Sequence, residues 1–192
     1  MIERCAECLT RWCCREEELK DEYFRAKIQY GIQSTLEFLY KFVFLFVIAV
    51  LLDRCMDFAI FIGLFFLLRF YAGGHHSKTS IGCLLSMILI ELTALGGMTI
   101  EIPVKVQMAG FLMAGVILVW LAPCDTPNNP IVDPQNREIK RWGTILCVLT
   151  YFILMILWSH NRNVFFMAGV LEAISVLIGK WNVDRIRNSY FR

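Results

Sequence analysis

A cysteine follows two adjacent histidines in the stretch LLRFYAGGHHSKTSIGC, residues 67–83. An imidazole can take the proton from a thiol, and the resulting thiolate can attack a carbonyl carbon. Seven residues of one straight helix span about 10.5 Å along its axis. That is too far for a hydrogen bond of about 3 Å between His76 and Cys83. A Cys/His pair therefore needs the chain to turn between these two residues.

The sequence around the two residues permits such a turn. Gly73 and Gly74 tolerate backbone conformations that other residues avoid, and the following SKTS supplies turn and cap residues. With Ser80 as the N-cap of the next helix, Cys83 would be its third residue, where the helix dipole favours a thiolate. Backbone N–H groups nearby could bind an oxyanion. This pattern is typical of a cysteine nucleophile with its base.

Other uses of these side chains stay open. His75, His76 and Cys83 are three ligand types for zinc, but no histidine at i+4 and no carboxylate motif accompanies them. Cys83 could also pack as a small residue between helices, with both histidines among the lipid headgroups. We expect no metal and no other cofactor, and the absence of a P-loop motif argues against an ATP-driven exporter.

Long apolar runs supply the elements that would position this chemistry. The chain has 192 residues, of which 57% are hydrophobic and 19% charged, whereas soluble domains carry about a quarter charged residues. The runs are close to the roughly 17 to 25 residues that a helix needs to cross a bilayer, and they lack the alternation of barrel strands. The sequence therefore predicts an all-α polytopic membrane protein with about six transmembrane helices. The runs cover residues 36–52, 56–70, 81–100, 104–122, 144–159 and 163–179.

Residues 1–33 precede the first run and are rich in charge. Their apolar residues recur at intervals of three and four, which indicates an amphipathic helix in the membrane interface; a loosely ordered charged tail is the alternative. The tetrad STLE fits a capping box with Ser34 as N-cap and Glu37 at the third helical position, so a new helix is expected to start there. We therefore divide the chain into an N-terminal cytoplasmic or interfacial segment, 1–33, and a six-helix transmembrane domain, 34–192.

The positive charges indicate an orientation in the membrane. Fifteen of the nineteen Lys and Arg residues lie in the N-terminal segment, in two of the connections and at the C-terminus. The positive-inside rule then places both termini, the connection 71–80 and the loop 123–143 in the cytoplasm. Thiols are kept reduced there, so the eight cysteines are not expected to form disulfides. The net charge of +2 gives no support for binding nucleic acid.

Several polar residues near or inside the apolar runs have more than one interpretation. Arg69 can bind a carboxylate or phosphate as a fork, or it can extend to the interface. The loop 123–143 holds four of the five prolines and is either a stiff linker or a segment that grips a peptide. Glu91 and Glu172 lie inside apolar runs, where a charge is costly. A small transporter or channel that lines a polar path with these two glutamates is the non-enzymatic alternative.

The motif RFYAGGHHSKTSIGC, at the end of the second hydrophobic run, resembles that of the AgrB (accessory gene regulator B) family of bacterial quorum-sensing peptidases. The segment LAPCDTPNNPIVDPQNREIKR is similar to that family's proline-rich cytoplasmic loop. The resemblance covers the chain from about residue 35 to its end. It implies a cysteine endopeptidase of the bacterial cell membrane that removes the C-terminal tail of an AgrD-type autoinducer propeptide.

The resemblance also implies roles for individual residues. Cys83 attacks a peptide bond of the propeptide, and His76 acts first as base and then as acid. An acyl-enzyme thioester remains, and a cysteine or serine of the peptide captures it to close a thiolactone or lactone ring. The family's arginine maps to Arg69 and its glycine to Gly74, both in positioning roles. The spacing to Gly74 and Cys83 selects His76 rather than His75 as the base.

The proline-rich loop departs from the family pattern. Many members carry lysines where this sequence has Asn128 and Asn129, so a basic contact with the substrate is expected to have moved to Arg137, Lys140 or Arg141. These residues would complement an acidic propeptide tail. The expected partners are thus the propeptide and the lipid bilayer, and a homodimer is expected from the family alone.

Overall fold

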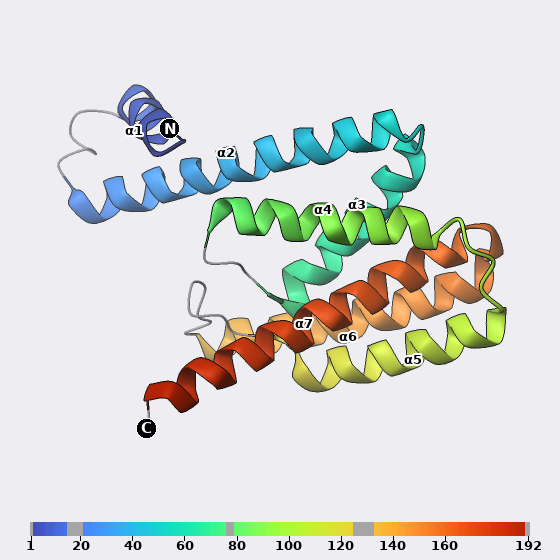
Figure 1. Ribbon diagram of the computed structural model, residues 1–192. Helices are drawn as coiled ribbons and strands as arrows, with labels where there is room; N and C mark the ends of the chain where they lie inside the picture. The colour runs from blue at the N-terminus through green and yellow to red at the C-terminus, as the bar shows by residue number, and fades with distance from the viewer. Residues whose placement is uncertain (1, 15–20, 76–78, 125–132, 191–192) are drawn as a thin grey trace. The chain divides into compact units, whose positions relative to one another are not determined.

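Seven α-helices and one short 3₁₀ helix form the described part of the chain, residues 2–14, 21–75, 79–124 and 133–190 of a computed structural model (Figure 1). Six of these helices, all except α1, are long and apolar enough to cross a membrane. The predicted all-α polytopic membrane fold is therefore confirmed. The elements are α1 (Ile2–Cys13), α2 (Glu22–Leu51), α3 (Cys55–Ala72), α4 (Ser80–Gly97), α5 (Val104–Leu121), α6 (Pro134–Leu157), η2 (Ser159–Asn161) and α7 (Arg162–Tyr190).

The chain divides into two compact units, residues 1–53 and 54–192. In the first unit α1 packs against α2 and buries Ala6 and Thr10, and the threonine hydroxyl donates to the Ala6 carbonyl oxygen at 2.8 Å. Trp12 on the same helix is exposed. α1 is therefore amphipathic, as the intervals of its apolar residues predict. Its place in a membrane interface stays a prediction.

The second helix of this unit begins well before Ser34. Asp21 is its N-cap, and its carboxylate accepts hydrogen bonds from the N–H groups two and three residues further on, at 3.0 and 3.2 Å. The helix then continues without interruption to its end, and Glu37 pairs with Lys41 Nζ at 3.2 Å. The predicted helix start at Ser34 is wrong. The N-cap residue of a capping box has a non-helical backbone, whereas Ser34 lies inside α2. The division of the chain after residue 33 stays a prediction.

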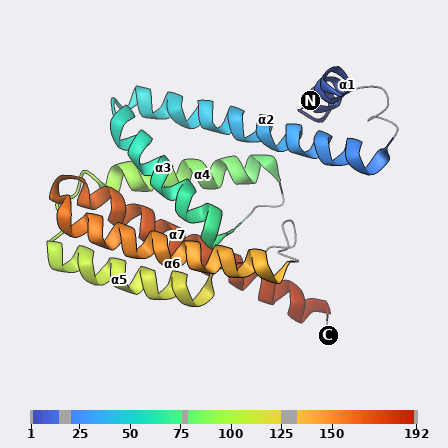
Figure 2. The ribbon, with the colours of Figure 1, turned by 180° about the vertical axis from the view of Figure 1, so that it is seen from behind.

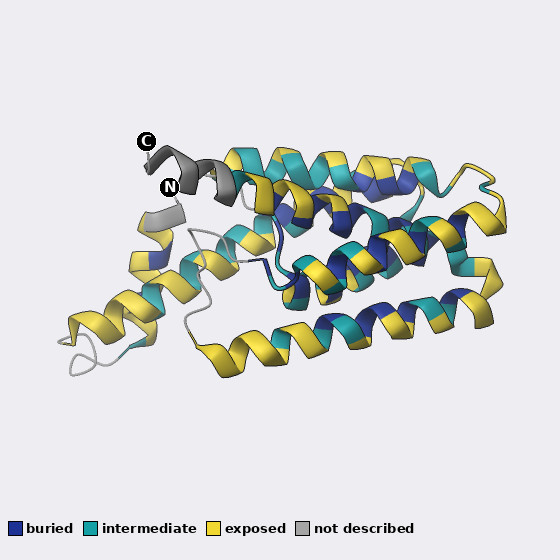
Figure 3. Ribbon diagram, turned by 90° about the horizontal axis from the view of Figure 1, so that it is seen from below, coloured by how far each residue is buried: buried dark blue, intermediate teal, exposed yellow. Residues whose placement is uncertain are grey.

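Helix α7 is the centre of the second unit. It contacts each of the other four long helices of that unit, α3, α4, α5 and α6, and Figures 1 and 2 show it from opposite sides. Buried positions concentrate where these helices meet (Figure 3). Because α7 contacts all of them, a side chain on α7 can reach the ends of helices that are far apart in the sequence. The hydrophobic core of the second unit includes Leu68, Phe111, Leu118, Met155 and Val176.

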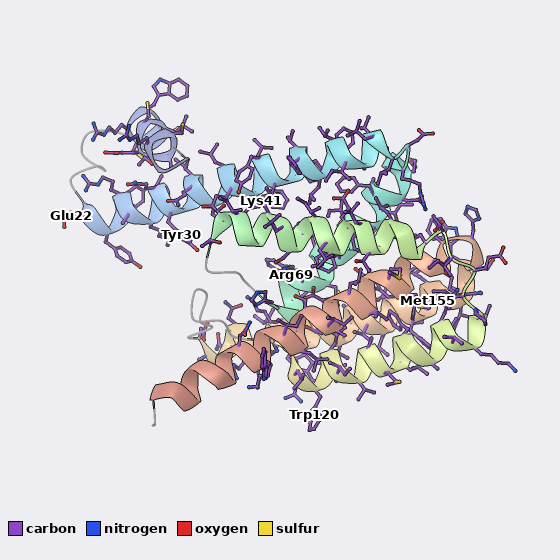
Figure 4. All side chains as sticks on the ribbon, viewed as in Figure 1. Glu22, Tyr30, Lys41, Arg69, Trp120 and Met155 are labelled. Atoms are coloured by element: carbon purple, nitrogen blue, oxygen red, sulfur yellow. The ribbon has the colours of Figure 1, made fainter. Side chains whose placement is uncertain are left out.

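The outward surfaces of these helices are also apolar. Trp120 at the end of α5 is exposed and points away from the bundle (Figure 4), as do apolar side chains on other turns of α5 and on α6. A water-soluble protein rarely exposes so large a contiguous apolar surface. The surface is instead suited to contact with lipid, which agrees with the six candidate spans.

Successive helices of the second unit run in opposite directions, so its connections gather at two ends. One end holds the segments 73–75 and 122–124 and the late turns of α7, and it is called the motif end below. Gly73 pairs there with Cys124 as an isolated parallel β-bridge, and the Cys124 N–H donates to the Ala72 carbonyl oxygen at 2.8 Å. The motif end therefore brings together two loops that lie about fifty residues apart in the sequence. Which side of the membrane it faces stays a prediction.

Candidate active site

Cys83 lies in the first turn of α4, at the motif end, and is partly exposed. The N-cap of this helix is Thr79, whose Oγ1 accepts a hydrogen bond from the Gly82 N–H at 3.1 Å. Ser80 already has a helical conformation, so it is not the cap that the sequence predicts. Cys83 is accordingly the fourth helical residue and not the third, and its own N–H donates to the Thr79 carbonyl oxygen at 3.0 Å. The thiol still lies at the positive end of the helix dipole. The Cys83 N–H, however, is already hydrogen-bonded within the helix and is not available to bind an oxyanion.

His76 lies outside the described residues, so its pairing with Cys83 stays a prediction. Both flanks of the intervening turn are described. Helix α3 ends at Ala72, the chain passes along α7 through residues 73–75, and α4 begins at Ser80. Cys83 is thus separated from residue 75 by the break between α3 and α4.

The two glycines before the histidines both have positive φ, at 75° for Gly73 and 145° for Gly74. Residues with a side chain rarely adopt this backbone conformation, and there is also little space for a Cβ atom at either position. A Cβ on Gly73 would lie 2.6 Å from the Cys124 carbonyl oxygen, and one on Gly74 would lie 2.7 Å from Ser175 Oγ and 2.9 Å from Arg69 Nη1. Gly74 is needed because three polar side chains close around its backbone.

The substitution Gly74→Ala is expected to lower the free energy of unfolding by about 1–3 kcal/mol, since the added Cβ combines backbone strain with a clash. Thermal unfolding of the detergent-solubilised protein measures this. Gly63→Ala is the matched control, because Gly63 lies in α3 with open space around its Cα and alanine favours a helix. An equal loss of stability in both variants would contradict the crowding of Gly74.

Arg69, on the last turn of α3 (Figure 4), directs its guanidinium toward α7. Nη1 donates to Ser175 Oγ at 2.7 Å and to Glu172 Oε2 at 3.4 Å, and Nη2 donates to the carbonyl oxygen of His75. The Glu172 side chain is 0% exposed and that of Arg69 15%. Of the two interpretations of Arg69, contact with a carboxylate is observed, but it is made by Nη1 alone and not as a fork, and the carboxylate comes from within the chain.

The backbone and ring of His75 are held by the same face of α7. Its N–H donates to the Ser175 carbonyl oxygen at 3.1 Å and lies 3.2 Å from Ser175 Oγ, while its ring Nδ1 lies 3.1 Å from Asn182 Nδ2. Gly179 admits this close approach, since a Cβ there would lie 3.0 Å from the His75 nitrogen. His75 is therefore an anchored residue, and the chain enters position 76 from a fixed point.

The comparisons with known proteins cover most of the chain. The family described as AgrB, accessory gene regulator B, matches residues 6–180. This chain belongs to the AgrB family. The match includes Arg69, Gly74 and Cys83 and extends through α7 as far as Lys180, so the family relationship covers both halves of the Arg69 network.

Relatives in several bacteria match at moderate identity. An AgrB-like protein of Clostridium perfringens (strain SM101 / Type A) is 27% identical over 163 residues, which cover 79% of this chain and 75% of that protein. The accessory gene regulator protein B of Staphylococcus lugdunensis is 26% identical over 179 residues, 92% of this chain and 94% of that protein. An AgrB-like protein of Lactiplantibacillus plantarum is 23% identical over 153 residues, 79% and 76% of the two chains. No solved structure matches this AgrB chain.

The basic residues that the sequence assigns to substrate contact lie on the first turns of α6, at the motif end of this AgrB protein. Asp133 caps that helix by accepting from the Gln135 N–H at 3.0 Å. Arg137 and Arg141 are exposed, whereas Lys140 is half-buried with its Nζ 6.0 Å from the centre of the Phe70 ring. Since Phe70 follows Arg69, Lys140 lies beside the motif. The substrate roles of these residues stay predictions, and Asn128 and Asn129 lie outside the described residues.

The remaining buried glutamate stands apart from this network. Glu91 on α4 is 1% exposed, and neither of its carboxylate oxygens has a hydrogen-bond partner among the described residues. Within residues 4–14, 21–75, 79–124 and 133–182, no three His, Cys, Asp or Glu side chains cluster to hold a metal ion. The alternative zinc site includes His76, which lies outside the described residues, so an experiment is needed to test it.

The contacts of α7 with Arg69 and His75 were not expected from the sequence. The sequence indicates Glu172 as a costly charge or as part of a polar path, and it does not indicate Ser175 or Asn182. All three recur at helical intervals along one face of α7, which is the signal that could have marked them. That signal does not indicate that Glu172 and Ser175 bind Arg69 or that Asn182 lies beside the His75 ring, because each pair is more than a hundred residues apart.

Proposed function

We propose that this AgrB protein is a membrane cysteine endopeptidase that removes the C-terminal tail of an AgrD-type propeptide in the agr quorum-sensing system. Membership of the family supports a role in that system and an AgrD propeptide as partner. The observation that carries the proposal is the place of Cys83. Its thiol is partly exposed in the first turn of α4, and the chain leading to His76 is anchored by α7.

In the proposed reaction, His76 takes the proton of the Cys83 thiol, and the thiolate attacks the carbonyl carbon of the scissile bond. The positive end of the α4 dipole favours the anionic nucleophile. Collapse of the tetrahedral intermediate breaks the C–N bond, and the amine of the leaving tail takes the proton from His76. The rest of the peptide remains on Cys83 as a thioester.

The thioester then accounts for cyclisation. A cysteine thiol or serine hydroxyl of the bound peptide attacks the thioester carbonyl, releases Cys83 as a thiol and closes a thiolactone or lactone. Because the thioester retains much of the reactivity needed to form the ring, this step requires no ATP. The basic residues at the start of α6 supply positive charge for an acidic tail.

The experiment uses the full chain in lipid vesicles with a short AgrD-type propeptide, one with an amphipathic start, a central Cys or Ser and an acidic tail. Alkylation of the chain by iodoacetamide is expected to abolish removal of the tail, and a metal chelator is expected to leave the rate unchanged. Mass spectrometry of the peptide measures both. Loss of cleavage with the chelator but not with the alkylating agent would contradict the cysteine mechanism and indicate zinc.

A further inference from the structure

Burying the ion pair of Arg69 and Glu172 costs free energy, because two charged groups lose their contact with water. Both partners are withdrawn from water, and Glu172 Oε1 has no hydrogen-bond partner among the described residues. A buried pair of this kind often stabilises a fold no better than apolar side chains of the same volume. Stability alone therefore does not account for Glu172.

What the pair holds is a carbonyl group next to the predicted base. Arg69 divides its donors between Glu172, Ser175 and the carbonyl oxygen of His75. A peptide unit is planar, so fixing this carbonyl limits the directions in which the chain can continue to residue 76. Arg69 is in turn kept in place by a carboxylate that opposes its charge.

We propose that Glu172 is a positioning residue, which acts through Arg69 to orient the His75 carbonyl and so sets where His76 enters the active site. The proposal rests on the proposed function, in which His76 is the base. The two anchors of α7 act on the same short segment from different sides. Ser175 holds the His75 N–H, and Glu172 holds the arginine that binds the His75 carbonyl.

The substitution Glu172→Gln tests the charge while it preserves the shape of the side chain. A hydrogen bond from arginine to a neutral amide is weaker than one to a carboxylate, so the guanidinium should be held less firmly. Glu91→Gln is the matched control, because Glu91 is equally buried on a neighbouring helix and has no hydrogen bond to Arg69.

The first measurement is amide hydrogen exchange of the full chain in lipid vesicles. Arg69 donates both to the His75 carbonyl oxygen and to Ser175 Oγ, which lies 3.2 Å from the His75 nitrogen. A less firmly held Arg69 should therefore loosen residue 75 as a whole, and Glu172→Gln is expected to speed exchange at the His75 N–H about tenfold, the factor that separates charged from neutral hydrogen bonds. Glu91→Gln should leave it at the wild-type rate. This readout needs no substrate, so it tests the positioning contact even if wild-type protein fails to cleave the propeptide, a result that would refute only the proposed function.

The second measurement is the rate of alkylation of Cys83 against pH, followed by peptide mass spectrometry to separate this thiol from the other seven. Glu172→Gln is expected to move the profile in the same direction as His76→Ala, and Glu91→Gln should not move it. A purely structural role of Glu172 would reduce the amount of folded protein without moving this profile. Wild-type exchange at His75 together with a wild-type profile in Glu172→Gln would overturn the proposal.

A second variant keeps the proposal testable if Glu172→Gln does not fold. Glu172→Asp retains the charge but draws the carboxylate back by one methylene group from an Arg69 contact that is already 3.4 Å long. It is expected to speed exchange at His75 and to move the Cys83 profile in the same direction, by smaller amounts. Wild-type behaviour of a folded Glu172→Asp variant in both measurements would equally overturn the proposal.

Discussion

Replacement of Cys83 by alanine is expected to lower the rate of propeptide cleavage by about 10⁴-fold or more, to the background level. Without the thiol no thioester forms, so the variant should also yield no cyclic peptide. The substitution removes one sulfur atom from a partly exposed site, and the fold should be unaffected. Cleavage of the co-expressed propeptide, followed by gel shift and mass spectrometry, measures the loss.

Cys55→Ala is the matched control. Cys55 is also partly buried and also lies in the first turn of a transmembrane helix, α3, but at the end opposite to the motif. Both thiols thus lie near a helix N-terminus, but only Cys83 lies at the motif end. Full cleavage by Cys83→Ala, or equal losses in the two variants, would refute the cysteine peptidase.

The transmembrane architecture could be predicted because length and hydropathy are properties of contiguous sequence. The six runs correspond to six helices, and the errors lie at their ends. α2 begins twelve residues before Ser34 because Asp21, which was not singled out, caps it. At α4 two adjacent hydroxyl residues are equally plausible caps, and only the extended backbone of Thr79 (ψ 147°) decides between them.

The candidate site could be predicted where its signal is local. Glycine is the residue type that tolerates the positive φ found at Gly73 and Gly74, and the place of Cys83 in the first turn of α4 follows from its position at the start of the hydrophobic run 81–100. The contacts of Arg69 could not be predicted from one sequence. Its partners lie 103 and 106 residues away, and no short motif relates an arginine on one helix to a glutamate and a serine on another.

Replacement of Arg69 by alanine is expected to lower the free energy of unfolding by about 3–5 kcal/mol, because it leaves the carboxylate of Glu172 buried without its opposing charge. Thermal unfolding in detergent measures the change. Arg54→Ala is the control. Arg54 pairs with Asp57 at 2.5 Å, but the two side chains are 25% and 38% exposed, and pairs near the surface contribute about 0–1 kcal/mol. Similar losses in the two variants would show that burial of the Arg69 pair adds nothing.

The double variant Arg69→Met/Glu172→Leu separates the two functions of this pair. It leaves no buried charge, so its stability is expected to return to within about 1 kcal/mol of wild type or to exceed it. Cleavage of the propeptide should nevertheless be lost, because a methionine at position 69 cannot donate a hydrogen bond to the His75 carbonyl oxygen. A double variant that is stable and still cleaves the propeptide would mean that the pair serves the fold alone. A stable and inactive double variant would show that the Arg69–Glu172 pair serves to orient the His75 carbonyl group and not to stabilise the fold.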